Sequence, residues 1–157
     1  MESAVIDAAK PEELRQAKII FTTNGKYEQT RQSVTSLLFA EEDEEFMHPT
    51  QYALDLTLSL LENANADLVT RGTQFPRGTS STSDRGGVYL FWEENGNSIQ
   101  LEVPPKNGGM LYIHFVSSQE SIMNKNVSSV ALADALTKLT SSRKLGISRV
   151  PASAATR

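Results

Sequence analysis

The chain has 157 residues, of which 39% are hydrophobic and 22% charged, and it contains no cysteine. This length suits one domain with a single sizeable core. The lack of cysteine excludes disulfide bonds, thiolate metal sites and a cysteine nucleophile. The net charge of −4 is unlike that of a generic nucleic-acid-binding protein.

The charges are unevenly distributed along the chain. Residues 1–45 contain ten acidic and five basic side chains, and residues 46–124 contain eight and four. Residues 125–157 carry six basic side chains and a single acidic one, Asp134. The net charge therefore hides an acidic first part and a basic last part. No apolar run reaches the ~18 residues that cross a membrane, and the start lacks a secretory leader pattern, so we expect a cytoplasmic protein.

Residues 1–45 have the weakest pattern and are expected to form a poorly defined helical region. A proline followed by two glutamates at 11–13 is typical of a first helical turn. The apolar spacing over 27–40 predicts a second helix. The acidic run at 41–45 predicts a solvated break, because adjacent carboxylates repel each other and resist burial. The core domain is expected over 46–145.

The clearest helix is predicted from about Pro49 to Ala66, with leucines recurring on one face. The stretch 54–60 also alternates between apolar and polar residues, which leaves a strand open, but the length of the pattern favours a helix. His48, just before the proline, is interpreted as a residue that caps this helix. The polar residues 70–87, rich in Gly, Ser, Thr and Arg, predict a loop.

The strongest pattern is a β-hairpin, in which two alternating runs, 88–92 and 98–103, flank Glu94-Asn95-Gly96-Asn97. An Asn-Gly pair suits a type I′ turn, because both central positions need positive φ. A tip at Asn95-Gly96 pairs Trp92 with Ile99, Leu90 with Leu101 and Val88 with Val103. A tip at Gly96-Asn97 would shift this pairing by two residues.

The remaining residues predict a third strand and a last helix. Residues 104–109, rich in proline and glycine, form a loop, and Met110–Val116 follows as the strand. A helix is predicted from Ser129 to about Lys144, and residues 146–157 are expected to form a disordered tail. The predicted fold class is α+β: a three-stranded antiparallel meander, with room for a fourth strand, packed against helices.

The run Gly86-Gly87-Val88-Tyr89-Leu90-Phe91-Trp92, with the hairpin and strand that follow it, resembles a group of small uncharacterised bacterial proteins. In these, a helix, a Gly-Gly-x-x-x-x-Trp β-meander and a closing helix follow one another. The likeness covers about residues 49–140 and implies the fold. It implies no activity, so no residue takes a role from it.

One face of the predicted meander carries aromatic side chains around a polar pair. Stacked aromatic residues on a sheet hold the bases in one RNA-binding module, whereas a sheet that is apolar on both faces is usually covered by another segment or a second subunit. A carboxylate in the middle would repel phosphate, so a protein partner or a second copy suits this face better than nucleic acid. The candidate partner-binding residues are Tyr89, Phe91, Gln100, Glu102, Tyr112 and His114.

No catalytic or cofactor motif is recognisable, so we expect no catalytic residue, no cofactor and no metal. His48 and His114 lack the partner spacing of a zinc site or a triad, and a metal held by His48 with Glu44 and Glu45 would be weak and exposed. The glycine pairs at 86–87 and 108–109 lack the lysine of a phosphate-binding loop and are interpreted as tight turns.

Three functional hypotheses follow. The first is a non-catalytic protein–protein interaction module, such as a small bacterial adaptor or antitoxin. The second is a single-stranded nucleic-acid binder that uses Tyr89, Phe91, Tyr112 and the basic C-terminal segment. The third is an enzyme with His114 and Glu102 acting across the sheet face.

Overall fold

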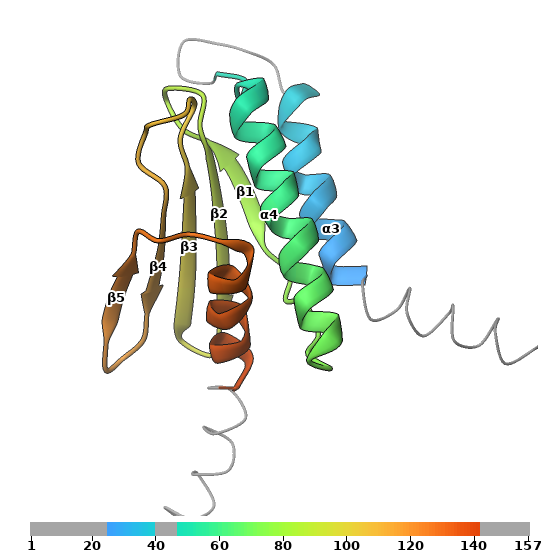
Figure 1. Ribbon diagram of the computed structural model, residues 1–157, viewed down its shortest axis with the longest axis vertical. Coiled ribbons are helices and arrows are strands. Elements are labelled where there is room, and N and C mark those ends of the chain that lie inside the picture. Colours follow the sequence, from blue (N-terminus) through green and yellow to red (C-terminus); the bar gives the residue numbers. More distant parts are fainter. Residues whose placement is uncertain (1–24, 40–46, 142–157) are drawn as a thin grey trace, which may run out of the picture.

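A computed structural model of the chain describes residues 25–39 and 47–141. It has an α+β fold whose five strands form one antiparallel sheet in the order β1-β2-β3-β4-β5. Figure 1 shows the helices gathered on one face of this sheet. In chain order the elements are α3 (Gly25–Thr35), the 3-10 helix η1 (Ser36–Phe39), α4 (Gln51–Thr70), β1 (Thr79–Thr82), β2 (Val88–Glu94), β3 (Asn97–Val103), β4 (Tyr112–Val116), β5 (Ser121–Asn124) and a helix at 129–141.

The expected second helix is present as α3 followed by η1. Three predictions lie outside the described residues: the helix that starts at 11–13, the acidic break at 41–45 and the tail at 146–157. The last helix begins at residue 129 as predicted, and its predicted end also lies outside the described part of the chain.

The helix α4 confirms the clearest helical pattern but differs from the prediction at both ends. Its N-cap is Thr50 rather than His48, since the Thr50 hydroxyl accepts the Ala53 N–H at 3.1 Å. The same hydroxyl donates to the Pro105 carbonyl at 2.6 Å, which ties the start of the helix to the loop after β3. The helix continues to Thr70, and Leu68 prolongs its buried face.

The hairpin β2–β3 has the predicted register. Trp92 lies opposite Ile99, Leu90 opposite Leu101 and Val88 opposite Val103. At the tip, Asn95 has a φ of 56° and Gly96 a φ of 85°, as a type I′ turn requires. The alternative tip at Gly96-Asn97 is therefore wrong.

The strand count differs from the prediction, because a strand of four residues was missed at each edge of the sheet. β1, with the sequence Thr-Ser-Ser-Thr, lies inside the predicted loop 70–87 and pairs with β2. β5 follows β4 through a turn in which the Ser117 N–H donates to the Glu120 carbonyl at 2.8 Å. Backbone hydrogen bonds hold both strands, so side-chain pattern does not reveal them. β4 itself starts at Tyr112 instead of the predicted Met110.

The hydrophobic core lies between the sheet and the helices, with Trp92 fully buried in it. The Trp92 indole donates to the Pro76 carbonyl at 3.1 Å, and its ring meets the Phe75 ring edge-to-face with centroids 6.2 Å apart. The Phe75 ring in turn meets that of Tyr27, which belongs to α3. Residues of α3 therefore share one core with the sheet.

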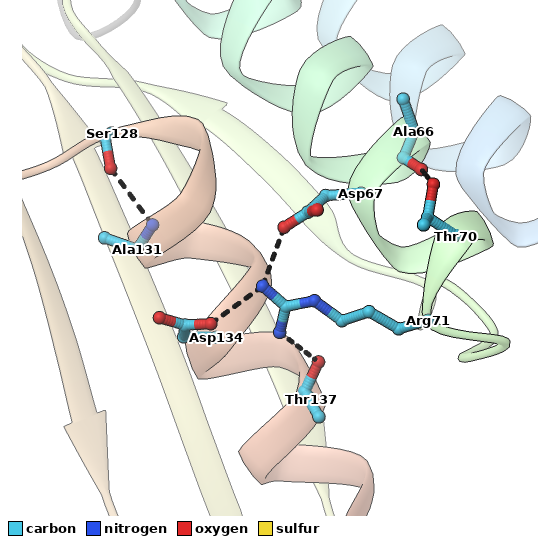
Figure 2. Close-up of polar contacts among 8 residues, drawn as sticks. All are labelled: Ala66, Asp67, Thr70, Arg71, Ser128, Ala131, Asp134 and Thr137. Carbon is cyan, nitrogen blue, oxygen red and sulfur yellow. Dashed lines mark hydrogen bonds and ion pairs between the residues drawn. The ribbon is translucent and has the colours of Figure 1, made fainter.

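Arg71, directly after α4, links this helix to the helix 129–141 (Figure 2). Its guanidinium lies 2.7 Å from Asp67 Oδ2 and 2.8 Å from Asp134 Oδ1, and it donates to the Thr137 hydroxyl at 3.2 Å. The hydrogen bond to Asp134 is the main cause of a raised Arg71 pKa. The guanidinium thus joins the two helices as a permanent cation.

We expect Arg71→Gln to lower the melting temperature slightly, because glutamine cannot bridge both carboxylates. Exposed ion pairs are weak and are screened by salt, so the difference from the unchanged chain should shrink in about 1 M NaCl. Thermal unfolding followed by far-UV circular dichroism at low and high salt measures this. Arg85→Gln, at an exposed position in the loop before β2, is the control. A loss that is equal at both salt concentrations would contradict an ionic link.

Candidate functional site

The candidate site is the sheet face that points away from the helices, which we call the helix-free face. Side chains alternate between the two faces of each strand, so the register places every second residue there. No helix or strand of the described residues lies over this face (Figure 1). Its residues are Thr79, Ser81, Tyr89, Phe91, Glu93, Ser98, Gln100, Glu102, Tyr112, His114, Val116, Ser121 and Met123.

The structure brings all six predicted partner-binding residues together on the helix-free face. They form two adjacent rows across β2, β3 and β4. One row is Tyr89, Glu102 and Tyr112, and the other is Phe91, Gln100 and His114. Residues directly opposite each other in antiparallel strands have Cβ atoms about 4.5–5.5 Å apart, so each row is a continuous set of neighbouring side chains.

In the first row, Glu102 lies between two phenols. A hydrogen bond from the Tyr112 hydroxyl to Glu102, together with partial burial and the charge of Glu102, raises the pKa of Tyr112 to about 12. Partial burial is the main cause of a raised Tyr89 pKa, followed by the charge of Glu102. Both phenols therefore stay protonated at neutral pH and hold the carboxylate in place.

Glu102→Gln should lower the pKa of Tyr112 from about 12 toward the ordinary value of about 10. A pKa above the unfolded value adds stability that is complete below about pH 10 and is lost as the pH rises toward 12. The unfolding free energy of the unchanged chain should therefore fall over this range, and that of Glu102→Gln should fall less. Tyrosinate absorbance gives the titration and urea unfolding the stability.

The matched control for this titration is Glu93→Gln, which removes another carboxylate from the same face. It should leave the tyrosinate titration close to that of the unchanged chain. If the titration of Glu102→Gln were also unchanged, Glu102 would not be the acceptor of the Tyr112 hydroxyl.

The second row continues onto β5. His114 lies opposite Met123, and its Nε2 atom is 2.8 Å from the Ser121 hydroxyl. Phe91 is 41% exposed and Met123 49% exposed, so the row presents apolar surface at two points. The imidazole–hydroxyl pair therefore links β4 to β5.

The same geometry bears on the enzyme hypothesis. His114 and Glu102 share the face, but they stand in different rows. The carboxylate accepts the Tyr112 hydroxyl, and the imidazole is bonded to exposed Ser121. A nucleophile–base–carboxylate relay needs the carboxylate on the imidazole, and the carboxylate here is held by a phenol. His114 and Glu102 therefore do not form such a relay in this structure.

The charge of the helix-free face is negative. Its residues include Glu93 and Glu102 and no lysine or arginine. Phosphate binding relies on basic side chains, so this face is unfavourable for nucleic acid. Most of the basic C-terminal segment invoked for nucleic-acid binding, residues 142–157, lies outside the described part of the chain.

Sequence reasoning missed the parts of the face that β1 and β5 contribute. Met123 extends the second row, and Ser121 lies beside it in the next row, opposite Val116. Thr79 and Ser81 extend the two rows on the other side. β1 and β5 have only four residues each. An alternation of apolar and polar residues cannot be recognised over so short a stretch. The turn at Ser117–Glu120 was the one local signal that could have indicated β5.

Comparisons with protein families, curated proteins and solved structures give no match to the chain. Within 25–39 and 47–141, no three His, Asp or Glu side chains form a group suited to a metal ion. Glu44 and Glu45, the other ligands of the metal site considered with His48, lie outside these ranges. In the same ranges no helix has both the length and the apolar character to span a membrane.

Proposed function

We propose that the chain is a non-catalytic protein-interaction module that binds a protein partner through the helix-free face. The observation that carries the proposal is the pair of adjacent rows that place three aromatic rings and an imidazole on one sheet surface, over which no described helix or strand lies. Aromatic side chains are enriched at interface centres, and they lose little conformational entropy on binding. Small adaptors and antitoxins belong to this functional class.

The chemistry of the face indicates the kind of partner. Glu102 is held between Tyr89 and Tyr112 but keeps acceptor capacity, because a carboxylate can accept several hydrogen bonds. A partner with an arginine or lysine above Glu102 would complement this charge. Apolar side chains of the partner would cover the exposed parts of Phe91 and Met123. This pattern fits a basic protein surface.

The test compares two variants as baits for partners from native lysate. Phe91→Ser removes the exposed ring from the helix-free face, and Val130→Ser removes a 55% exposed apolar side chain from the opposite side of the molecule. The expected result is a protein retained by the unchanged chain and by Val130→Ser and lost with Phe91→Ser. Titration calorimetry with the purified partner should then show at least about tenfold weaker binding for Phe91→Ser and Glu102→Gln.

Other results would overturn this function. A partner bound equally by Phe91→Ser would place the interface elsewhere. Binding of a labelled single-stranded oligonucleotide that weakens with salt and is lost with Phe91→Ser would favour the nucleic-acid hypothesis instead. The reporter for that assay must be on the oligonucleotide, since Trp92 is buried on the other face of the sheet.

A further inference from the structure

The strand β5 is an edge of the sheet whose outer side is unpaired among the described residues. The bond from Ser117 N–H to the Glu120 carbonyl fixes which residues bond to β4. Hydrogen-bonded and non-hydrogen-bonded pairs alternate in an antiparallel ladder. Ser117 and Glu120 form a hydrogen-bonded pair, so the pair of Val116 and Ser121 is non-hydrogen-bonded and the pair of Phe115 and Ile122 is hydrogen-bonded. The backbone N–H and C=O groups of Ile122 therefore point toward β4. The N–H and C=O groups of Ser121 and Met123 therefore point away from the sheet, toward the free edge.

The side chains of β5 give this edge no protection against pairing. Natural edge strands usually carry proline, an inward-pointing charge or a bulge that prevents another strand from adding. The sequence Ser-Ile-Met-Asn has neither proline nor charge, and the side chains of Ile122 and Met123 are 44% and 49% exposed. In Figure 1, β5 is the outermost strand, and no labelled element lies beyond it.

We propose that β5 pairs antiparallel with β5 of a second copy, about a two-fold axis perpendicular to the sheet. Such an axis keeps the helices of both copies on the same face of the joined sheet. Residues whose side chains point to the helix-covered face, which we call inward, therefore lie opposite inward residues of the second copy. The register that follows sets Ile122 opposite Ile122 of the second copy and Ser121 opposite its Met123. The outward backbone groups of Ser121 and Met123 then bond to each other across the axis, and the two sheets become one.

This register is chemically self-complementary. On the inward side, Glu120 comes to lie opposite Asn124 of the second copy, where the amide can donate to the carboxylate. Glu120 is already oriented by Lys138, whose ammonium lies 2.8 Å from its Oε2 atom and 4.6 Å from the centre of the Phe115 ring. The pairing therefore uses two carboxylate–amide contacts, related by the axis, around a central isoleucine pair.

A cavity beside Ile122 leaves room for the incoming side chain. It has a volume of about 180 Å³ and lies between β4, β5 and the helix 129–141. Mostly apolar residues line it, among them Ile113, Phe115, Ile122, Ala131 and Ala135. Ile122 of the second copy would enter at the mouth of this cavity and reduce the apolar surface that both copies leave exposed.

The geometry favours pairing of β5 with β5 of a second copy over head-to-tail pairing of β5 with β1 of a second copy. A pairing of β5 with itself closes after two copies, whereas a pairing of β5 with β1 would continue into a fibre unless the rotation closed a ring. β1 is also entirely polar, and its Ser80 is engaged by Ser33 of α3. Because the shared strand is short, the interface lies in the small class typical of weak, reversible association.

The absence of cysteine from the chain allows a direct test by crosslinking. In the proposed register, residue 122 forms a non-hydrogen-bonded pair with Cα atoms about 4.5 Å apart, which lies within the disulfide range of about 4.4–6.8 Å. Ile122→Cys at about 100 µM under mild oxidation should therefore become mainly a covalent dimer on a non-reducing gel. Val130→Cys, at a position 55% exposed on the helix 129–141, is the control and should stay mainly monomeric.

A second substitution separates strand pairing from random collision. Met123→Pro, added to Ile122→Cys, removes an N–H that points to the free edge, so it should abolish crosslinking and preserve the ladder with β4. Circular dichroism checks the fold, and Ser121→Pro, which removes the other outward N–H, replaces this variant if it unfolds.

The proposal would be overturned if Ile122→Cys formed the crosslink no faster than Val130→Cys. It would also be overturned if the added proline left crosslinking unchanged in a variant that still folds. A dimer of the unchanged chain that Phe91→Ser disrupts and Met123→Pro does not would also overturn it, because that dimer would use the helix-free face.

Discussion

Trp92→Ala should lower the unfolding free energy by about 3–5 kcal/mol, the range for removal of a large buried aromatic side chain. The Trp92 side chain is fully buried. Its ring packs against Phe75, and its indole N–H donates to the Pro76 carbonyl. Single domains are typically stable by only about 5–15 kcal/mol, so this variant should be close to unfolding at room temperature. Urea denaturation followed by far-UV circular dichroism measures the loss, since the variant lacks the only tryptophan.

Phe91→Ala is the matched control, because Phe91 is the preceding residue of β2 and points to the helix-free face. Its ring is 41% exposed, so its removal should cost about 1 kcal/mol or less. Trp92→Phe should lower the unfolding free energy by an intermediate amount, about 1–3 kcal/mol. Phenylalanine keeps most of the packing but leaves the Pro76 carbonyl without its hydrogen-bond donor. Equal losses for Trp92→Ala and Phe91→Ala would contradict the assignment of the two faces.

Gly87→Ala should lower the unfolding free energy by about 3 kcal/mol, at the upper end of the usual cost of overpacking. A Cβ atom at this position would collide with the Val103 carbonyl oxygen and lie 3.0 Å from the Ser83 hydroxyl. Neither atom can easily withdraw, because Val103 pairs with Val88 at the start of the hairpin and the Ser83 hydroxyl accepts the Gly87 N–H at 2.8 Å. The measurement is again urea unfolding by circular dichroism.

Gly25→Ala is the control for this prediction. A Cβ atom at Gly25, the first residue of α3, meets no other atom within 4 Å. Alanine should therefore be neutral or stabilise the protein by up to about 1 kcal/mol, through lower entropy of the unfolded chain and better helix propensity. If Gly87→Ala were as harmless as Gly25→Ala, β2 and the end of β3 would have to be further apart than the structure has them.

These two predictions also explain the Gly-Gly-x-x-x-x-Trp run in structural terms. Gly86 has a φ of 91°, a backbone conformation that residues with a Cβ atom rarely adopt. Gly87 allows the close approach to Val103, and Trp92 fills the core. All three positions are thus accounted for by the turn into β2 and by packing.

Much of the fold and the candidate face was predictable because local patterns suffice for it. Apolar residues at helical spacing identified α4, and the Asn95-Gly96 turn set the register of β2 and β3. Once that register is known, strict alternation separates buried Leu90 from Tyr89 and Phe91 on the other face. The six candidate residues therefore followed from the sequence, as did the central position of Glu102.

The sequence by itself determined the central hairpin, its register and the two-faced character of the sheet, since turn chemistry and residue periodicity act over a few residues. Only the tertiary structure decided where the sheet ends. β1 and β5 are held by backbone bonds to strands already in place, and such bonds carry no side-chain pattern. The hydrogen bond from Tyr112 to Glu102 and the link from Arg71 to Asp134 likewise depend on residues that meet only after the chain has folded.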